Sequence, residues 1–111
     1  MASVAVEPLR GEVWEAHVRG AGTHPFVILT VNPMIARLGA VTAALVTGTT
    51  GPRYTHIPLA AEAGLTEYDE SYANATDLHT IPKPRLHNRR GRLAGAELAS
   101  LEQAVRTYLG L

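Results

Sequence analysis

The residues of this sequence best suited to acid–base chemistry are its five histidines. They are His17, His24, His56, His79 and His87. Imidazole has an ordinary pKa of about 6.5, so it can take up or release a proton near neutral pH. No two of these histidines have the i, i+4 spacing of a helical metal site, and the chain has no cysteine. The histidines therefore indicate proton transfer rather than a zinc site.

Polar side chains gather where predicted strands begin or end. His24 precedes the apolar segment FVILTV, Thr47 follows the apolar segment AALV, and a further polar group lies in one short segment: Asn74, Thr76, Asp77, His79 and Thr80. Polar groups at strand ends can converge on one cleft. Alternatively, each makes only a local hydrogen bond that stabilises a turn.

Charge is unevenly distributed along the chain. The net charge is zero, which argues against a protein that coats nucleic acid without selectivity. Half of the basic residues fall between positions 83 and 92, namely Lys83, Arg85, Arg89, Arg90 and Arg92. This basic segment is either a phosphate-binding strip or a solvated surface balanced by the acidic segment of Glu62, Glu67, Asp69 and Glu70.

Hydrophobic periodicity predicts one α+β domain of 111 residues. We expect strands over 10–19, 26–31, 40–47, 54–59, 71–81 (with a bend) and 87–94, and a turn over 20–25. Two prolines exclude a central strand over 82–86. Residues 1–9 are expected to be a flexible tail, and no segment has the composition of a secretory signal or a membrane span. Closely spaced strands favour a small, bent antiparallel sheet or barrel.

Two helices are predicted. The first covers 32–39, with Asn32 as its N-cap. The second covers 95–111, lacks a polar N-cap and ends near Gly110. Its apolar face is expected to consist of Leu98, Leu101, Val105, Tyr108 and Leu109.

Three motifs follow one another along the chain: RGEVW at 10–14, Thr47 followed by THIPL at 55–59, and the segment 74–86. Their order, together with the terminal amphipathic helix, resembles the MazF/PemK family of toxin endoribonucleases, from Arg10 to Leu111. The resemblance implies a small SH3-like antiparallel barrel that forms homodimers. It also implies a cytoplasmic toxin, without metal or cofactor, that cleaves single-stranded mRNA and is neutralised by a cognate antitoxin.

The resemblance carries over to individual positions. Thr47 matches a family threonine at the end of the third strand, and His24 and His79 stand where the family has arginines. Thr76 replaces the usual acid, and Asp77 follows one place later. Because imidazole can act as a base or an acid, we expect His24 and His79 to form an acid–base pair, with Thr47 donating to the phosphate.

The residues expected to contact RNA are Arg10, Trp14, Arg53, Asn74, Thr76, Asp77, Thr80, Arg85 and Arg89. Trp14 could equally pack in the core, because it lies inside a predicted strand. Two other functions stay open on the same fold: a toxin that binds a protein such as DNA gyrase, and a module that has lost catalysis.

Overall fold

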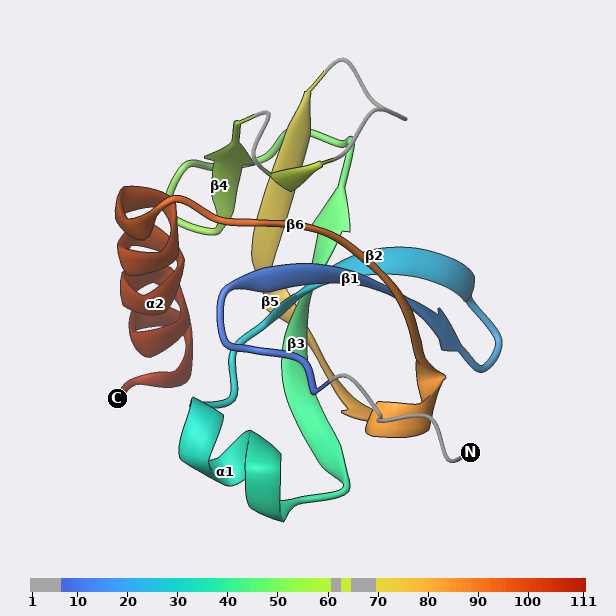
Figure 1. Ribbon diagram of the computed structural model, residues 1–111. Helices are drawn as coiled ribbons and strands as arrows, with labels where there is room; N and C mark the ends of the chain where they lie inside the picture. The colour runs from blue at the N-terminus through green and yellow to red at the C-terminus, as the bar shows by residue number, and fades with distance from the viewer. Residues whose placement is uncertain (1–6, 61–62, 65–69) are drawn as a thin grey trace, which may run out of the picture.

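The computed structural model describes residues 7–60, 63–64 and 70–111. Within these residues the order of elements is β1 (Glu12–Val18), β2 (Gly22–Ile28), α1 (Asn32–Arg37), β3 (Ala40–Thr47), β4 (His56–Leu59), β5 (Ser71–Pro82), the 3-10 turn η2 (Lys83–Arg85), β6 (Leu86–Arg92) and α2 (Gly95–Leu109). The predicted α+β class, with a C-terminal helix, is confirmed (Figure 1). None of the helices in the described ranges is long and apolar enough to cross a membrane.

The strands form one curved antiparallel sheet in the order β4-β5-β3-β2-β1-β6. Its edges, β4 and β6, are not paired with each other in the described residues, so the expected barrel is open at this seam. Residues 63–64 lie beside β6, where Nη2 of Arg90 donates to the carbonyl oxygen of Gly64 at 3.1 Å. A loop contact therefore replaces strand pairing along part of the seam.

The predicted turn at 20–25 is too long. β2 already begins at Gly22, and His24 pairs with Ala16 of β1. The turn is tight because Gly20 adopts a φ of 82°, which side chains other than glycine rarely tolerate. β2 also ends at Ile28 rather than at residue 31.

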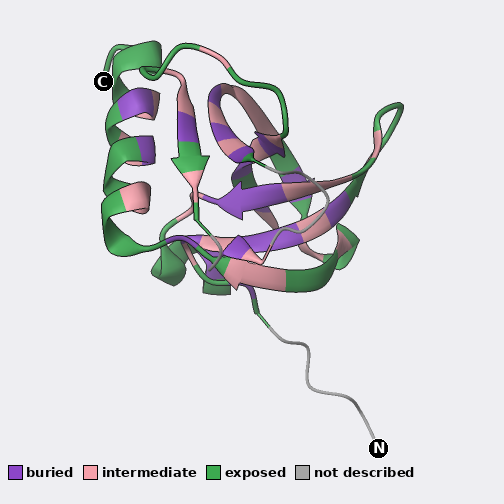
Figure 2. Cartoon of the chain, turned by 90° about the horizontal axis from the view of Figure 1, so that it is seen from above, coloured by how far each residue is buried: buried purple, intermediate pink, exposed green. Residues whose placement is uncertain are grey.

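The core consists of two apolar clusters, and neighbouring residues of β2 belong to different clusters, so the clusters lie on opposite faces of the sheet. Figure 2 shows buried residues along the strands and on the side of α2 that is turned to the sheet. Val27 belongs to the cluster covered by α2, whereas Phe26 and Ile28 belong to the other. All three side chains are fully buried. The apolar run at 26–28 is therefore covered on both faces of the sheet.

α2 covers the sheet with a shorter apolar face than predicted. Leu101 is fully buried, and Leu98 and Val105 pack against the same cluster. Tyr108 and Leu109 were expected to extend this face, but they are 53% and 50% exposed. The last turn of α2 is therefore only partly covered and does not join the buried cluster.

Both helices start differently from the prediction. Asn32 is not the N-cap of α1: the helix starts at this residue, and its Oδ1 accepts a hydrogen bond from the Arg10 N–H at 2.7 Å. At the start of α2, the Glu97 carboxylate accepts hydrogen bonds from the N–H groups of Ala94 (2.7 Å) and Ala60 (2.6 Å). Glu97 thus supplies the missing cap and joins α2 to the end of β4.

The bounds of the remaining strands and the order of the N-terminal segment agree with the predictions only in part. β3 has the expected bounds, and the bend in β5 appears as a register shift opposite Leu45. β4 is shorter than expected, because Arg53–Thr55 form a turn.

Part of the segment 1–9, which was expected to be a flexible tail, is ordered: Pro8 is buried and the Glu7 carboxylate lies 2.9 Å from Lys83 Nζ. Residues 1–6 and the acidic residues Glu62, Glu67 and Asp69 lie outside the described residues.

Candidate active site

A bulge in β5 places polar side chains on the sheet face that is not covered by α2. Ala75 and Leu78 both pack toward α2, and strict alternation would leave one residue between two such positions rather than two. Thr76 and Asp77 therefore both lie in the bulge. Asn74 Oδ1 accepts hydrogen bonds from the backbone N–H of Thr76 at 3.0 Å and from its hydroxyl at 2.7 Å. Bulges are frequent next to active sites, where they redirect side chains.

His79 is held by two neighbours on this face. Its Nε2 lies 2.6 Å from Oδ1 of Asp77. Its ring also meets the buried Phe26 ring edge to face, with 5.2 Å between the ring centroids. The His79 side chain remains 30% exposed. It is therefore oriented by the protein and still open to a ligand.

His24 lies in β2, two residues before Phe26, so both side chains point to the same face of the sheet. Its Nε2 lies 2.6 Å from the carbonyl oxygen of Ala21. A carbonyl oxygen can only accept a hydrogen bond, so Nε2 carries the proton. His24 thus makes a local hydrogen bond in the turn, which was the alternative to a catalytic role. Its Nδ1 has no partner in the described residues.

Thr47 ends β3 and pairs with Tyr72 of β5. By alternation its side chain lies on the face of Ala43 and Leu45. Its Oγ1 accepts a hydrogen bond from the Thr49 N–H at 3.1 Å, which leaves the hydroxyl proton available to a ligand. A polar cavity of about 300 Å³ lies beside this end of β5 and is lined in part by Arg53, His56, Glu70 and Tyr72.

The structure places most, but not all, of the predicted polar residues on one face. His24, Thr47, Asn74, Asp77 and His79 share the sheet face opposite α2. Thr80 pairs with Thr42 and alternates with His79, so it lies on the other face. The β2–β3 ladder begins only at Phe26 and Leu45, and the two strands diverge toward His24 and Thr47 (Figure 1). Among the described residues, no hydrogen bond, ion pair or ring contact joins His24 to Thr47 or His79.

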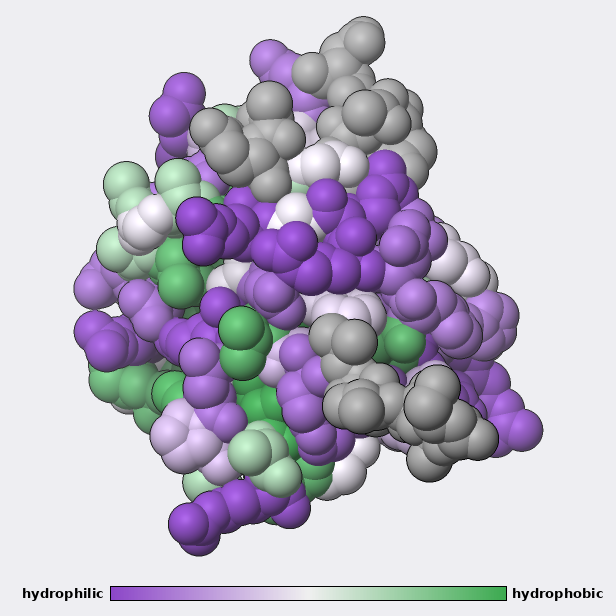
Figure 3. Space-filling model, viewed as in Figure 1, coloured by the Kyte–Doolittle hydropathy of each residue, from purple (hydrophilic) through white to green (hydrophobic). Residues whose placement is uncertain are grey.

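Two of the four arginines predicted to contact RNA, Arg10 and Arg89, are engaged within the protein, as is Arg90 of the basic segment. Arg10 forms an ion pair with Glu102 of α2, Arg89 with Glu12 and Arg90 with Glu15. Arg89 and Arg90 belong to β6, and Figure 3 shows a hydrophilic band in the region of this strand. The carboxylates of Glu12 and Glu15, near the N-terminus, therefore balance part of the basic segment. Arg53 and Arg85 are exposed and have no ion-pair partner among the described residues.

Trp14 lies in the core and is 7% exposed. Its indole N–H donates to Oε1 of Glu12 at 3.0 Å. The structure thus places Trp14 among apolar neighbours in the core, which was the alternative to an RNA contact.

Glu12 is a structural residue that the sequence did not single out. Burial would raise the pKa of its carboxyl, but hydrogen bonds from Trp14, the Leu9 N–H and Arg89 outweigh burial and lower that pKa. Its place inside the motif RGEVW was the one available signal. Glu12 connects the N-terminal segment, β1 and β6.

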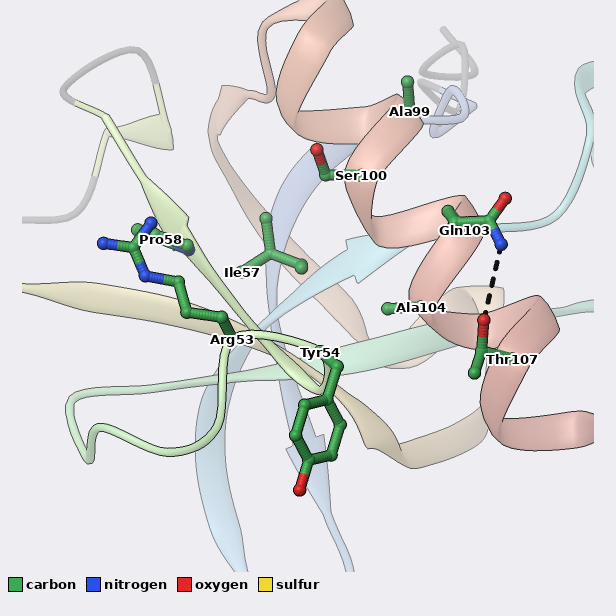
Figure 4. A pocket seen from close by; sticks show the side chains of 9 residues that line it. All are labelled: Arg53, Tyr54, Ile57, Pro58, Ala99, Ser100, Gln103, Ala104 and Thr107. Atoms are coloured by element: carbon green, nitrogen blue, oxygen red, sulfur yellow. Dashed lines mark hydrogen bonds between the residues drawn. The ribbon is translucent and has the colours of Figure 1, made fainter.

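A second cavity, of about 500 Å³, lies between β4 and α2 (Figure 4). Of the predicted site residues, it is lined only by Arg53. No three histidine, aspartate or glutamate side chains of the described residues are arranged to hold a metal ion. The polar face with His79 and Thr47 is therefore the candidate active site.

Comparisons with known proteins agree with this geometry. Residues 9–109 match the family described as PemK-like, MazF-like toxin of type II toxin–antitoxin systems. The chain is 32% identical over 101 residues to the probable endoribonuclease MazF2 of Mycobacterium tuberculosis, covering 91% of this chain and 97% of that protein.

Solved structures show the same fold. An endoribonuclease in complex with its cognate antitoxin, from a mycobacterial species, superposes with a TM-score of 0.84 at 29% identity, covering 94% of this chain and 96% of the other. The Mycobacterium tuberculosis toxin MazF-mt6 gives a TM-score of 0.80 at 26% identity, covering 90% and 97%. The chain therefore belongs to the PemK-like, MazF-like family of toxins of type II toxin–antitoxin systems.

Proposed function

We propose that this MazF-type endoribonuclease cleaves single-stranded RNA without a metal ion, using the ribose 2′-hydroxyl as nucleophile. The observation that supports this site most directly is the shared face of Thr47, Asn74, Asp77 and His79. It provides a group for proton transfer and a neutral donor beside a partly exposed sheet surface. RNA as substrate is in keeping with the endoribonuclease relatives.

The proposed reaction is a transesterification at phosphorus. A neutral histidine accepts the proton of the 2′-hydroxyl at Nδ1, and the 2′ oxygen attacks the adjacent phosphorus. The P–O5′ bond breaks, leaving a 2′,3′-cyclic phosphate, and the second histidine, in its imidazolium form, protonates the 5′ oxygen. His24 and His79 suit these steps because each directs Nε2 to an acceptor and leaves Nδ1 without a partner in the described residues.

The reaction also requires a hydrogen-bond donor that stabilises the negative charge developing on the phosphoryl oxygens. Thr47 meets it with the hydroxyl proton that its contact with Thr49 leaves available. Histidine holds negative charge less well than the arginine expected in the family, because a neutral imidazole carries no charge. Arg53 is exposed near the start of β5 and Arg85 just after its end, and both are proposed to bind flanking phosphates.

The proposed partners are mRNA, a second copy of the chain and an antitoxin. The solved mycobacterial relative was obtained with its cognate antitoxin. A short acidic tail on such a partner would complement Arg53 and Arg85, and it would compete with RNA. A homodimer would use the same surface of both copies, and light scattering of the purified protein tests it. The proposed location is the cytoplasm, where mRNA is found.

Digestion of a mixed-sequence RNA in the presence of EDTA tests the function. Cleavage is expected, with ends mapped by primer extension. His24→Ala and His79→Ala should each lower kcat by about 10²–10⁴-fold, the usual effect of a positioned acid or base. His17→Ala is the matched control, because His17 is exposed on the adjacent strand β1.

Two results would contradict the proposal. Unchanged cleavage by His24→Ala would remove His24 from the acid–base pair. Intact RNA in every digest, combined with inhibition of DNA gyrase, would favour the protein-binding toxin instead.

A further inference from the structure

Asp77 and His79 form an isolated acid–imidazole pair on the candidate active-site face. The 2.6 Å between Oδ1 of Asp77 and Nε2 of His79 is typical of a strong, charge-assisted hydrogen bond. The two side chains are 41% and 30% exposed, so both can meet a ligand that lies on the sheet. No other ion pair within the described residues contains a histidine.

The bulge explains how the pair arises. β5 pairs regularly with β3 from Ile81 to Leu78, then shifts register before Ala73. Asp77 is the first residue beyond the regular stretch. Because the backbone is irregular there, its carboxylate can turn toward the ring two residues later, instead of standing parallel to it as in a regular strand. The register shift in β5 thus allows the Asp77 carboxylate to orient the His79 imidazole.

Phe26 limits the remaining freedom of this imidazole. It is fully buried on β2, and its ring meets the His79 ring at 74° between the ring planes. β3 separates their two strands, and Ala43, a small residue, lies on this face between them. The His79 ring is therefore held at Nε2 by Asp77 and on another side by Phe26, and Nδ1 is the ring nitrogen left for a substrate.

From these contacts we infer that Asp77 is a positioning residue, which holds the His79 ring so that Nδ1 faces the RNA. The inference rests on the proposed role of His79 in cleavage. It also assigns Asp77 a role different from direct contact with RNA. Asp77 transfers no proton to the substrate, because its oxygen accepts the Nε2–H of His79 throughout the reaction.

A double-mutant cycle separates positioning from an independent role. Asp77→Ala should lower kcat by about 10²-fold with KM little changed, because a misplaced group costs rate more than binding. Adding Asp77→Ala to His79→Ala should cause no further loss, since Asp77 acts only through His79. Asp77→Asn should recover most of the rate, because an amide oxygen still accepts from Nε2–H. Glu7→Ala, which removes an exposed ion-paired carboxylate elsewhere, is the matched control.

Proton NMR provides a readout that does not depend on activity. The Nε2–H of His79 should give a downfield resonance protected from exchange with water. This resonance should persist in Asp77→Asn and Glu7→Ala and disappear in Asp77→Ala. Circular dichroism shows whether each variant is folded.

The possible failures can be told apart. Wild-type protein that cleaves no RNA would refute the proposed function and, with it, the role of Asp77. An active enzyme in which Asp77→Ala keeps its kcat, or in which the two losses multiply, would refute the positioning role alone.

Discussion

Nε of Arg89 on β6 lies 2.6 Å from a carboxylate oxygen of Glu12 on β1. The same carboxylate accepts hydrogen bonds from the Leu9 N–H at 2.7 Å and the Trp14 indole at 3.0 Å. One acidic side chain thus fastens an edge strand and the N-terminal segment to the sheet. Arg89, which the sequence suggested as an RNA contact, is part of this structural connection.

The Glu12 carboxylate should make the free energy of unfolding depend on pH. Its pKa is lowered in the folded protein, because the three hydrogen bonds outweigh the opposing effect of burial. Its stabilising contribution is therefore complete above the pKa of the unfolded chain and is lost as the pH falls through the folded pKa. Glu12→Gln should lower the free energy of unfolding by about 1–2 kcal/mol at neutral pH.

Urea unfolding followed by circular dichroism measures this effect. The wild-type and Glu12→Gln curves should converge in acid, where the wild-type carboxyl is protonated. Glu7→Gln, at an exposed pair, should change stability by less than about 0.5 kcal/mol. A constant difference between wild type and Glu12→Gln at every pH would contradict the explanation.

The middle and the C-terminal end of α2 should respond differently when a leucine side chain is shortened to alanine. Leu101→Ala removes a fully buried side chain and should cost about 2–5 kcal/mol of stability. Leu109→Ala removes a half-exposed one, with an expected cost below about 0.5 kcal/mol. Thermal unfolding compares the two variants. Similar losses would mean that the apolar face extends to the end of the helix, as the periodicity alone predicts.

The seam between β4 and β6 should tolerate no side chain at position 64. A Cβ on Gly64 would lie 1.8 Å from the carbonyl oxygen of Arg90, and its φ is +73°. Gly64→Ala should therefore cost about 2 kcal/mol or more. Gly39→Ala is the control, because a Cβ there meets no atom within 4 Å. Equal melting temperatures for both variants would contradict the close packing of this segment.

Two nearby arginines should separate RNA affinity from stability. Arg85 is exposed without an ion pair in the described residues, whereas Arg89 pairs with Glu12. Arg85→Ala should weaken binding of a single-stranded RNA oligonucleotide and reduce the salt slope by about 0.7, the value for one phosphate contact. Its melting temperature should not change.

Arg89→Ala should show the reverse pattern, with a lower melting temperature and an almost unchanged salt slope. Fluorescence anisotropy over a salt series provides both slopes. If Arg89→Ala reduced the slope as much as Arg85→Ala, Arg89 would be a phosphate contact as well.

Local sequence patterns were sufficient to predict those features that depend only on residues close together in the chain. The run at 40–47 predicted β3 with its observed bounds. The prolines at 82 and 84 correctly indicated a break at Lys83–Arg85, although Pro82 still ends β5 and Leu86 begins β6. The motifs RGEVW and 74–86 predicted the family. Such features follow from side-chain alternation, proline geometry and motif order, and all three can be read directly from the order of the residues.

Contacts between distant segments could not be predicted in the same way. The sequence offered the acidic segment at 62–70 as one way to balance the basic segment, but it gave no sign of the ion pairs that the structure shows with Glu7, Glu12 and Glu15. Charge patterning identifies the sign of a segment, but the strand order determines which carboxylates lie beside it. β6 is next to β1 in the sheet, and no local signal predicts that neighbour.

Local patterns along the chain specify the α+β class, the sheet-forming segments, the terminal helix and the residue types available for acid–base chemistry. Which of these residues share a face depends on how the strands pair in three dimensions. It directed Asp77 toward His79 through a bulge and left Thr80 on the opposite side. It also kept His24 at the diverging end of β2. The reason is that strand register and bulges depend on pairing between segments far apart in the chain, and a shift of one residue moves a side chain to the other face.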